Sequence, residues 1–434
     1  MPILDKMVMT YSEACKYFPG GVNSPVRACR VVGIEPPIVS KAYRDVFTDS
    51  QGKDYIDFCN SWGSLIHGHS HLQIIETISH YSSLGISYGL TSEHEIAFAS
   101  TLLSVLGYEE HKVRFVSSGT EATMTAVRLA CGITARSVII KFSGCYHGHA
   151  DVLLSGISIN EENISSLISI IDTYRSSRHY LPLTLILPYN DLPLFHEVMN
   201  LIGDLVACVI FEPVCANMGV ILPVPGFLEG ILATCRRFSS LSIVDEVVTG
   251  FRLGLRGACE KFSLVPDITV YGKILGGGMA VASLVAHQQI LDHLQPSGSV
   301  FQAGTLSGNP IAMAVGKASI GLCSVPGFYD ALNTLALEFF SPIQAEILSR
   351  GFPVSLVYAG SMFTFFFSET PPNSFSEAQQ SDISRFGKFY RQAFSRGVYL
   401  SPSPLEASFL SSIHSRENLT YTQNVLIDSL SDCF

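Results

Sequence analysis

Short apolar runs rich in β-branched residues alternate with longer segments of helical periodicity through the middle of the chain. Two of these runs organise the rest: residues 241–244 lead into Asp245, and residues 268–271 lead into Gly272 and Lys273. Runs of this kind are typical of strands that are buried on both faces of a parallel sheet. The pattern therefore predicts two strands, each with a charged residue at its carboxyl end.

The same alternation continues on both sides of these two strands. It predicts further strands at residues 113–116, 137–142, 205–211 and 281–286. It predicts helices at residues 74–80, 93–106, 122–130 and 226–238. Strands that alternate with helices are typical of an α/β fold with a mostly parallel central sheet.

Other parts of the chain depart from this alternation. Residues 45–57 predict a hairpin. Residues 153–187 predict a long irregular insertion, either a mobile lid or mere decoration. After about residue 325 the pattern changes to long helices and short strands, which is typical of an α+β domain. We therefore predict an N-terminal segment (1–66), a large α/β domain (67–324) and a small α+β C-terminal domain (325–434).

Asp245 and Lys273 are expected to converge on one site, because the carboxyl ends of parallel strands meet at one edge of a sheet. Pyridoxal phosphate needs this pair. A lysine holds its aldehyde as a Schiff base, and a carboxylate keeps its ring nitrogen protonated. Either residue alone is equally explained as a loop cap or a solvated charge. Together, in this strand context, they predict a pyridoxal phosphate site.

Residues 117–122 follow the predicted strand at 113–116 and precede a helix. The free N–H groups at a helix N-terminus favour an anion, Gly119 lets the backbone approach it, and Ser118 and Thr120 add hydroxyl donors. A plain N-cap with an acidic residue in the first turn explains the same letters. The small-residue loop at 303–310 is a second candidate for a phosphate contact.

Histidines stand at alternate positions in residues 67–71 and again in residues 145–151. On a strand such spacing could bind a metal, but the first stretch has no cysteine or carboxylate at ligand spacing and carries a glycine. We favour a site without metal in both places. Tyr146, just past the predicted strand at 137–142, is placed to stack on a flat cofactor ring.

The turn-rich residues 19–27 form an N-terminal loop that cannot be a regular helix. Within it, Ser24 and Arg27 are either solvated or directed into a site. The planar fork of arginine suits a carboxylate. The residues alone leave both alternatives open.

Composition narrows the classes of function. The chain has 434 residues, of which 47% are hydrophobic and 15% charged, and its formal charge is -10, so a nucleic-acid-binding surface is not expected. We find no secretion signal and no apolar run near the ~20 residues of a membrane span, so no membrane partner is expected. The eleven cysteines include no C-x-x-C pair, which favours reduced thiols and a cytoplasmic location.

Seven segments, taken together, carry a resemblance to a known family. They are residues 19–28, 117–122, 144–151, 212–219, 245–252, 272–278 and 303–310. In this order they resemble the signature segments of the glutamate-1-semialdehyde 2,1-aminomutase family, in the class III aminotransferase branch of fold-type I pyridoxal phosphate enzymes. The resemblance extends over nearly the whole chain. Singly, some of these segments are shared across the larger class.

The resemblance implies a role for each candidate residue. Lys273 would bind the cofactor and carry a proton, Asp245 would face the ring nitrogen, and Tyr146 would stack on the ring. The remaining cofactor contacts would be Ser118, Gly119, Thr120, Asn217 and Thr305, the last supplied by the partner subunit of a homodimer. The substrate contacts would be Ser24, Arg27 and Glu406.

The reaction that the resemblance implies is an amino-group exchange within one small molecule. Glutamate-1-semialdehyde would become 5-aminolevulinate, a tetrapyrrole precursor, with pyridoxal or pyridoxamine 5'-phosphate as cofactor. Two alternatives remain: an ω-aminotransferase that needs an external keto acid, and a catalytically silent binding protein with the same fold. The chain departs from the family at Ser143, where a glutamate is usual, and at residues 154–171, which lack the usual small-residue pattern.

Overall fold

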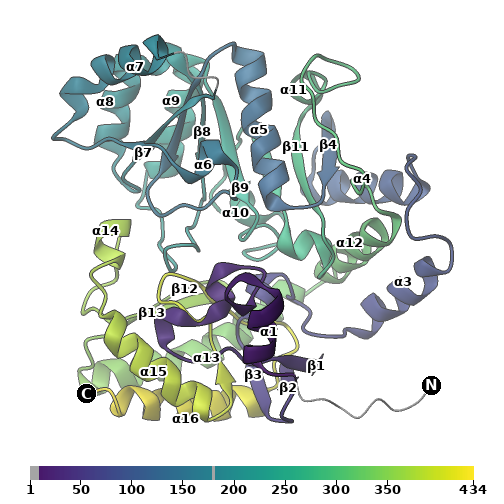
Figure 1. The fold of residues 1–434 in the computed structure, drawn as a ribbon, viewed down its shortest axis with the longest axis vertical. Coiled ribbons are helices and arrows are strands. Elements are labelled where there is room, and N and C mark those ends of the chain that lie inside the picture. The colour runs from purple at the N-terminus through teal and green to yellow at the C-terminus, as the bar shows by residue number, and fades with distance from the viewer. Residues whose placement is uncertain (1–8, 178–180) are drawn as a thin grey trace.

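The structure is a computed structural model that describes residues 9–177 and 181–434 (Figure 1). Its largest sheet has eight strands in the order β4-β11-β10-β9-β8-β5-β7-β6. Their bounds are β4 (His111–Val116), β5 (Val138–Phe142), β6 (Ile157–Ser158), β7 (Leu183–Leu187), β8 (Val206–Phe211), β9 (Leu241–Glu246), β10 (Ile268–Tyr271) and β11 (Ala282–His287). Neighbouring strands are parallel except around β11, which runs antiparallel to β10 and β4. The predicted α/β fold with a mostly parallel central sheet is confirmed.

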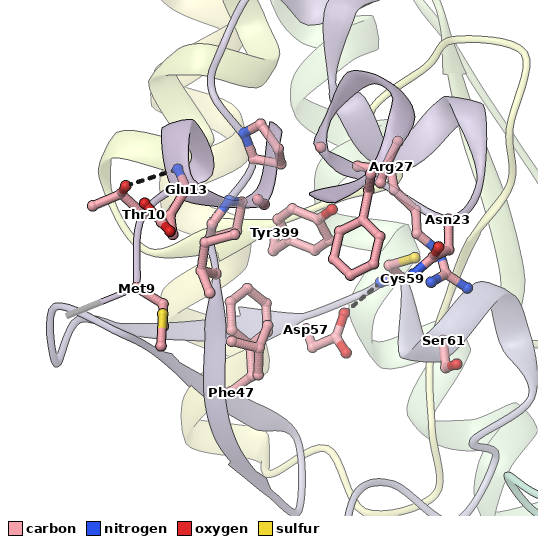
Figure 2. A pocket seen from close by; sticks show the side chains of 18 of the residues that line it. Met9, Thr10, Glu13, Asn23, Arg27, Phe47, Asp57, Cys59, Ser61 and Tyr399 are labelled. Atoms are coloured by element: carbon pink, nitrogen blue, oxygen red, sulfur yellow. Dashed lines mark hydrogen bonds between the residues drawn. The ribbon is translucent and has the colours of Figure 1, made fainter. Parts of the chain in front are cut away.

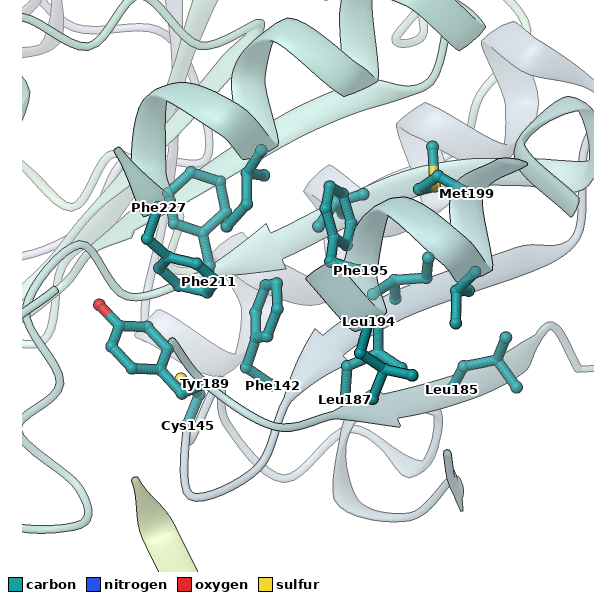
Figure 3. Close-up of a cluster of buried hydrophobic side chains, with 14 of the residues drawn as sticks. Phe142, Cys145, Leu185, Leu187, Tyr189, Leu194, Phe195, Met199, Phe211 and Phe227 are labelled. Carbon is teal, nitrogen blue, oxygen red and sulfur yellow. The ribbon is translucent and has the colours of Figure 1, made fainter. Parts of the chain in front are cut away.

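Helices cover both faces of this sheet, which is why its strands are apolar on both sides. On one face, α5 (Gly119–Thr134) packs small residues such as Ala122 and Ala126 on Ile210 and Ile243. On the other face, α8 (Leu192–Ile202) and α9 (Phe227–Phe238) pack on β5, β7 and β8. Figure 3 shows the aromatic part of this second layer, in which Phe142, Phe195, Phe211 and Phe227 meet.

The prediction of a long irregular insertion at residues 153–187 is wrong. Within it lie α6 (Asp151–Leu154), β6, the helix α7 (Leu167–Ser176) and β7, which pairs in parallel with β5. Leu167 and Ile171 of α7 and Leu185 of β7 are buried in the sheet's core. The apolar run at 183–187 is a strand like the others, but the polar residues of the preceding loops obscure the helical spacing before it. Residues 178–180 lie outside the described residues.

Two smaller sheets lie below the large one in Figure 1. The first has the order β1-β2-β3-β14, and the second has the order β12-β13-β15. Their strands are β1 (Val39–Tyr43), β2 (Val46–Asp49), β3 (Asp54–Asp57), β12 (Ser355–Ala359), β13 (Met362–Phe366), β14 (Val398–Tyr399) and β15 (Ser408–Phe409). The predicted hairpin is confirmed by the antiparallel pairing of β2 with β3. Because β14 pairs with β3, the first and last parts of the chain share a sheet, and the proposed domain boundaries stay a prediction.

The remaining helices pack around these sheets. They are α1 (Tyr11–Tyr17), α2 (Asn60–Gly63), α3 (Leu72–Ser82), α4 (Glu93–Leu106), α10 (Gly257–Lys261), α11 (Gln288–Leu291), α12 (Pro310–Cys323), α13 (Phe328–Arg350), α14 (Phe375–Ala378), α15 (Ile383–Ser395) and α16 (Arg416–Ser431). Among the helices described, none is by itself long and apolar enough to cross a membrane; α12 and α13 meet the length and composition test only as a pair bent by 72°.

The placement of β7 inside the sheet gives a stability prediction. Leu185 is 0% exposed, so we expect Leu185→Ala to lower the free energy of unfolding by about 2–5 kcal/mol through lost burial and a cavity. Leu181, four residues earlier, is 55% exposed, and Leu181→Ala is the matched control, with an expected change below about 0.5 kcal/mol. Urea unfolding measures both. Equal effects of the two substitutions would contradict this placement of β7.

Candidate active site

A cavity of about 290 Å³ lies at the carboxyl ends of β4, β5, β8, β9 and β10. Its volume is near the lower end of the range for small-ligand sites. Seven of the predicted site residues line it together: Ser118, Gly119, Thr120, Tyr146, Asn217, Asp245 and Lys273. The other four, Ser24, Arg27, Thr305 and Glu406, do not belong to its lining.

Asp245 and Lys273 reach this cavity because β9 and β10 are neighbours in parallel. Asp245 lies opposite Val270 in the register, and Lys273 follows β10 by two residues. Both side chains therefore leave the same edge of the sheet. The expected convergence of the two residues on one cavity is what the structure shows.

Asp245 is a buried carboxylate, 4% exposed, with two hydrogen-bond donors. The backbone N–H of Val247 donates to its Oδ1 at 3.0 Å, and Nδ1 of His147 lies 2.7 Å from its Oδ2. Burial by itself would lower the pKa of His147, but the hydrogen bond and charge of Asp245, with Cys145 adding to them, raise this pKa to about 9. Asp245 thus stabilises the protonated form of His147.

Lys273 has a half-buried side chain and a left-handed backbone with φ 49°. Burial lowers the pKa of its amine, and the positive charge of Arg252 lowers it further. The carboxylates of Glu406, Glu212 and Asp245 act in the opposite direction. The net lowering favours the neutral amine, which is the nucleophilic form and the form that accepts a proton.

Glu212, directly after β8, is a buried carboxylate that holds two candidate residues in place. Its Oε1 accepts from the N–H of Tyr146 at 2.9 Å and from Nδ2 of Asn217 at 3.0 Å. Its Oε2 accepts from the N–H of Ala216 at 2.9 Å. Burial raises the pKa of Glu212 to about 8. The sequence interpretation did not single out this residue, although its position at a strand's carboxyl end was a signal.

The start of α5 has both features that its sequence allowed: an N-cap and free N–H groups that suit an anion. Oγ of Ser118 accepts from the N–H of Glu121 at 3.2 Å, so Ser118 is an N-cap. The N–H groups of Gly119 and Thr120, at the first two helical positions, have no acceptor within the helix, and both residues line the cavity. A Cβ on Gly119 would lie 3.3 Å from Val247, so a side chain there would be crowded.

Tyr146 and Glu406 lie beside this cavity with different exposures. The Tyr146 side chain is 49% exposed, as an aromatic that covers a cavity would be. Burial raises the pKa of Tyr146, and the charge of Glu406 raises it further. Burial also raises the pKa of Glu406 to about 7, against the opposing charge of Lys273. Glu406 is therefore an electrostatic neighbour of both residues.

Arg27 lies in a second, larger cavity of about 700 Å³, with Asn23, Ser61 and Trp62 among its lining residues (Figure 2). Ser24 is the residue before the short helical turn Pro25–Ala28 that carries Arg27. The structure therefore does not bring Ser24 and Arg27 into the cavity of Lys273. Their expected role at the substrate carboxylate stays a prediction.

Thr305 lines a third cavity, of about 610 Å³, between the loop before α12 and the segment at residues 87–91. Ser307 and Asn309 lie in the same loop, and Nδ2 of Asn309 donates to the carbonyl of Ile86 at 2.7 Å. Within one chain, Thr305 is thus separate from the cavity of Asp245 and Lys273. Among the residues that the structure describes, no group of three or more His, Cys, Asp or Glu side chains could hold a metal ion.

The donor set of the smaller cavity fits pyridoxal phosphate. A buried carboxylate, Asp245, is available for a protonated ring nitrogen, and the amine of Lys273 is available for an aldehyde. Free N–H groups at Gly119 and Thr120 suit a phosphate. Tyr146 offers an exposed aromatic face.

These features define a fold-type I enzyme of the aminotransferase class. The sequence profile of the family described as aminotransferase class-III matches residues 32–403, and the chain belongs to this family. The resemblance stated from the sequence motifs is thereby confirmed.

Close relatives carry one name. The chain is 67% identical to the glutamate-1-semialdehyde 2,1-aminomutase of Chlamydia felis, over 100% of the chain and 99% of the relative. It is 60% identical to the enzyme of the same name from Chlamydia pneumoniae, over 99% and 97%. An omega-transaminase from Sphaerobacter thermophilus has a similar structure, with a TM-score of 0.86, 25% identity and coverage of 98% and 96%. A glutamate-1-semialdehyde-aminomutase from Pseudomonas aeruginosa PAO1 shares the fold at a TM-score of 0.84, with 21% identity and coverage of 98% and 94%.

The His147–Asp245 pair predicts that stability depends on pH. The pKa of His147 in the folded protein, about 9, lies above the ordinary value of 6.5 for histidine. The contribution of the His147–Asp245 pair to the free energy of unfolding is therefore complete below about pH 6.5 and is lost as pH rises through about 9. We expect the free energy of unfolding of the wild type to fall over this range relative to a His147→Gln variant. The fall is smaller than the roughly 3 kcal/mol of an isolated histidine, because, against burial, hydrogen bonds from Cys215 and His147 lower the pKa of Cys145 to about 5, and this thiol contributes in the opposite direction. Urea unfolding at a series of pH values measures it, and parallel curves for the two proteins would contradict the pairing.

Proposed function

We propose that this chain is a glutamate-1-semialdehyde 2,1-aminomutase. It would exchange the positions of the amino and oxo groups within one substrate and form 5-aminolevulinate, for tetrapyrrole synthesis. Relatives of 57–67% identity over nearly the full chain carry this name. The observation that carries the proposal is the meeting of Lys273 and Asp245 in one cavity with Tyr146 and the start of α5.

Pyridoxal or pyridoxamine 5'-phosphate is the proposed cofactor. When bound, it supplies an aldehyde that exchanges with amines and a ring that withdraws electrons from the substrate carbon. Asp245, whose position is fixed by His147 and Val247, would keep the ring nitrogen protonated. Glu212 fixes the backbone of Tyr146 and the side chain of Asn217, which would contact the cofactor. The N–H groups of Gly119 and Thr120 would bind the phosphate.

The chain's own acid–base group is the amine of Lys273. Because burial lowers its pKa, the neutral amine is available to take a proton from a substrate carbon and return it to another carbon. Glu406 interacts electrostatically with Lys273, and burial raises the pKa of Glu406 to about 7. Arg27 is the proposed partner of the substrate carboxylate, because its side chain is exposed in the larger cavity.

The activity has a direct test. We expect the protein to convert glutamate-1-semialdehyde to 5-aminolevulinate with no added keto acid. Lys273→Ala should lower the rate by at least about 10²–10⁴-fold, because the transferable proton loses its carrier. Lys261→Ala, at an exposed lysine of α10, is the control and should leave the rate unchanged. Turnover that appears only with a keto acid would contradict the proposal and favour an ω-aminotransferase, and no turnover with an unaltered cofactor spectrum would favour a silent binding protein.

We also propose a homodimer in which the partner subunit covers the cavity of Thr305. Tyr88 and Leu90 in the lining of that cavity are exposed, and so are large apolar side chains close to the lining residues in the sequence: Leu84, Ile86, Ile96, Phe301 and Leu306. An exposed apolar surface of this kind is typical of a subunit interface. In the dimer Thr305 would contact the cofactor phosphate of the partner subunit. A cytoplasmic location, with all eleven cysteines as free thiols, fits the same proposal.

Subunit mixing tests the sharing of Thr305. Thr305→Glu should repel the phosphate, and Thr305→Glu and Lys273→Ala proteins should each be inactive. A dimer with one subunit of each kind has one site in which both Lys273 and Thr305 are intact. After unfolding and joint refolding in equal amounts, we expect about a quarter of the wild-type activity, since half of the dimers are mixed and each has one intact site. A mixture with no more activity than its components would contradict the shared site, and the size of each protein by light scattering is the control.

A further inference from the structure

Arg252 is a fully buried guanidinium, 1% exposed, that lies between three distant parts of the chain. Its Nη2 donates to the carbonyl of Gly63 at 2.7 Å. Its Nη1 donates to Oγ of Ser361 at 2.8 Å and to the carbonyl of Leu410 at 3.1 Å. Among the described residues no carboxylate forms an ion pair with Arg252. Such a buried and uncompensated charge is costly, so its three neutral partners need a reason beyond stability.

The ring of Phe409 joins Arg252 to Lys273. The guanidinium carbon of Arg252 lies 4.9 Å from the ring centroid, and Nζ of Lys273 lies 6.0 Å from the same centroid. Gly63 packs directly against this ring, because a Cβ at Gly63 would lie 2.7 Å from Cε1 of Phe409. The guanidinium of Arg252 and the amine of Lys273 therefore lie near the same aromatic ring.

The carbonyl that Arg252 holds belongs to a strained turn. Asn60, Ser61 and Trp62 have φ values of 46°, 52° and 59°, and Gly63 follows at 82°, so α2 is a left-handed turn. This conformation is unfavourable for each residue with a side chain, because Cβ lies too close to the following carbonyl oxygen. Apart from Arg252, Nδ2 of Asn60 ties the turn to the carbonyl of Phe409 at 2.8 Å. Ser61 and Trp62 are wall residues of the larger cavity that contains Arg27.

We propose that Arg252 is a positioning residue that links the two cavities: it holds the left-handed turn so that Ser61 and Trp62 form the wall beside Arg27, and it places a positive charge beside the amine of Lys273. The link to catalysis rests on the proposed function. The contacts of Arg252 with the turn, and its position near the Lys273 amine, do not depend on the proposed function.

The electrostatic surroundings of Arg252 and Lys273 agree with this assignment. Burial lowers the pKa of Lys273, and the positive charge of Arg252 lowers it further. The negative charges of Glu406, Glu212 and Asp245 raise this pKa. Burial lowers the pKa of Arg252 to about 10, and the charges of Tyr329 and Cys323 counter this effect. The pKa of Arg252 thus stays above neutral pH, and the charge is present in the working range.

Two variants separate the two effects in the full-length, cofactor-free protein. Arg252→Met removes the positive charge and the hydrogen-bond donors. Arg252→Lys keeps the positive charge but loses the planar guanidinium with its two donating Nη atoms. Arg256→Met, at an exposed arginine four residues on, is the matched control. Circular dichroism identifies the variants that fold.

The first measurement is the titration of the Lys273 amine, followed by its rate of acetylation by acetic anhydride across pH, with peptide mass spectrometry. We expect the midpoint to rise by about one pH unit in Arg252→Met and to stay near the wild-type value in Arg252→Lys and Arg256→Met. A merely structural role would not distinguish the Lys variant from the Met variant. An unchanged midpoint in Arg252→Met, or equal shifts in both Arg252 variants, would overturn the electrostatic part.

The second measurement uses Trp62, which is the chain's single tryptophan and so reports the turn alone. We expect its emission maximum and its quenching by acrylamide to change in both Arg252 variants and not in Arg256→Met, because a lysine cannot reach three acceptors at once. A folded Arg252→Lys protein with wild-type emission and quenching would overturn the positioning part. Neither measurement uses substrate. A result against the role of Arg252 can therefore be told apart from a failure of the protein to make 5-aminolevulinate, which would count against the proposed function.

Discussion

The parallel pairing of β9 with β10 is the constraint on which the candidate site depends. It brings the carboxyl ends of two neighbouring strands to one edge, and with them Asp245 and Lys273. Strands β4, β5 and β8 run in the same direction, so the start of α5, the loop of Tyr146 and His147, and Glu212 reach that edge as well. Only the antiparallel β11 enters from this edge, and it contributes the residues before its first position. The site is thus a property of strand direction more than of any single loop.

The direction of the strands explains where the charged groups lie, and burial explains their hydrogen bonds and their pKa values. Carboxylates and cations that meet at one buried edge would be costly if each lacked partners. Asp245 and Glu212 instead accept from backbone N–H groups and from fixed side chains. Lys273 has no such network, so desolvation lowers its pKa and leaves an amine ready for reaction. Burial thus raises the pKa of Glu212 to about 8 and lowers the pKa of the Lys273 amine.

The sequence predicted those parts of the protein in which a local pattern determines the outcome. Apolar β-branched runs located β9 and β10, and their terminal charges located Asp245 and Lys273. The strand β7 was missed because the polar loops before it hide the helical spacing of α7, although its pairing with β5 makes it part of the core. Glu212 was not singled out because one of its three donors, the N–H of Tyr146, becomes its neighbour only when β8 lies beside β5. Periodicity carries no information about such contacts.

Contacts between distant segments were the least predictable, and they connect the separate parts of the site. The family resemblance alone supplied four of the candidate residues: Ser24, Arg27, Thr305 and Glu406. Within one chain, Ser24, Arg27 and Thr305 lie outside the cavity of Lys273 and its immediate neighbours. A left-handed turn of three non-glycine residues would not persist on local energetics. It persists because Phe409 packs on Gly63 and a buried arginine holds the carbonyl of Gly63. The strain at residues 60–63 is therefore maintained by the same contacts that reach the lysine, so the wall of one cavity and the reactive group of the other cannot change independently.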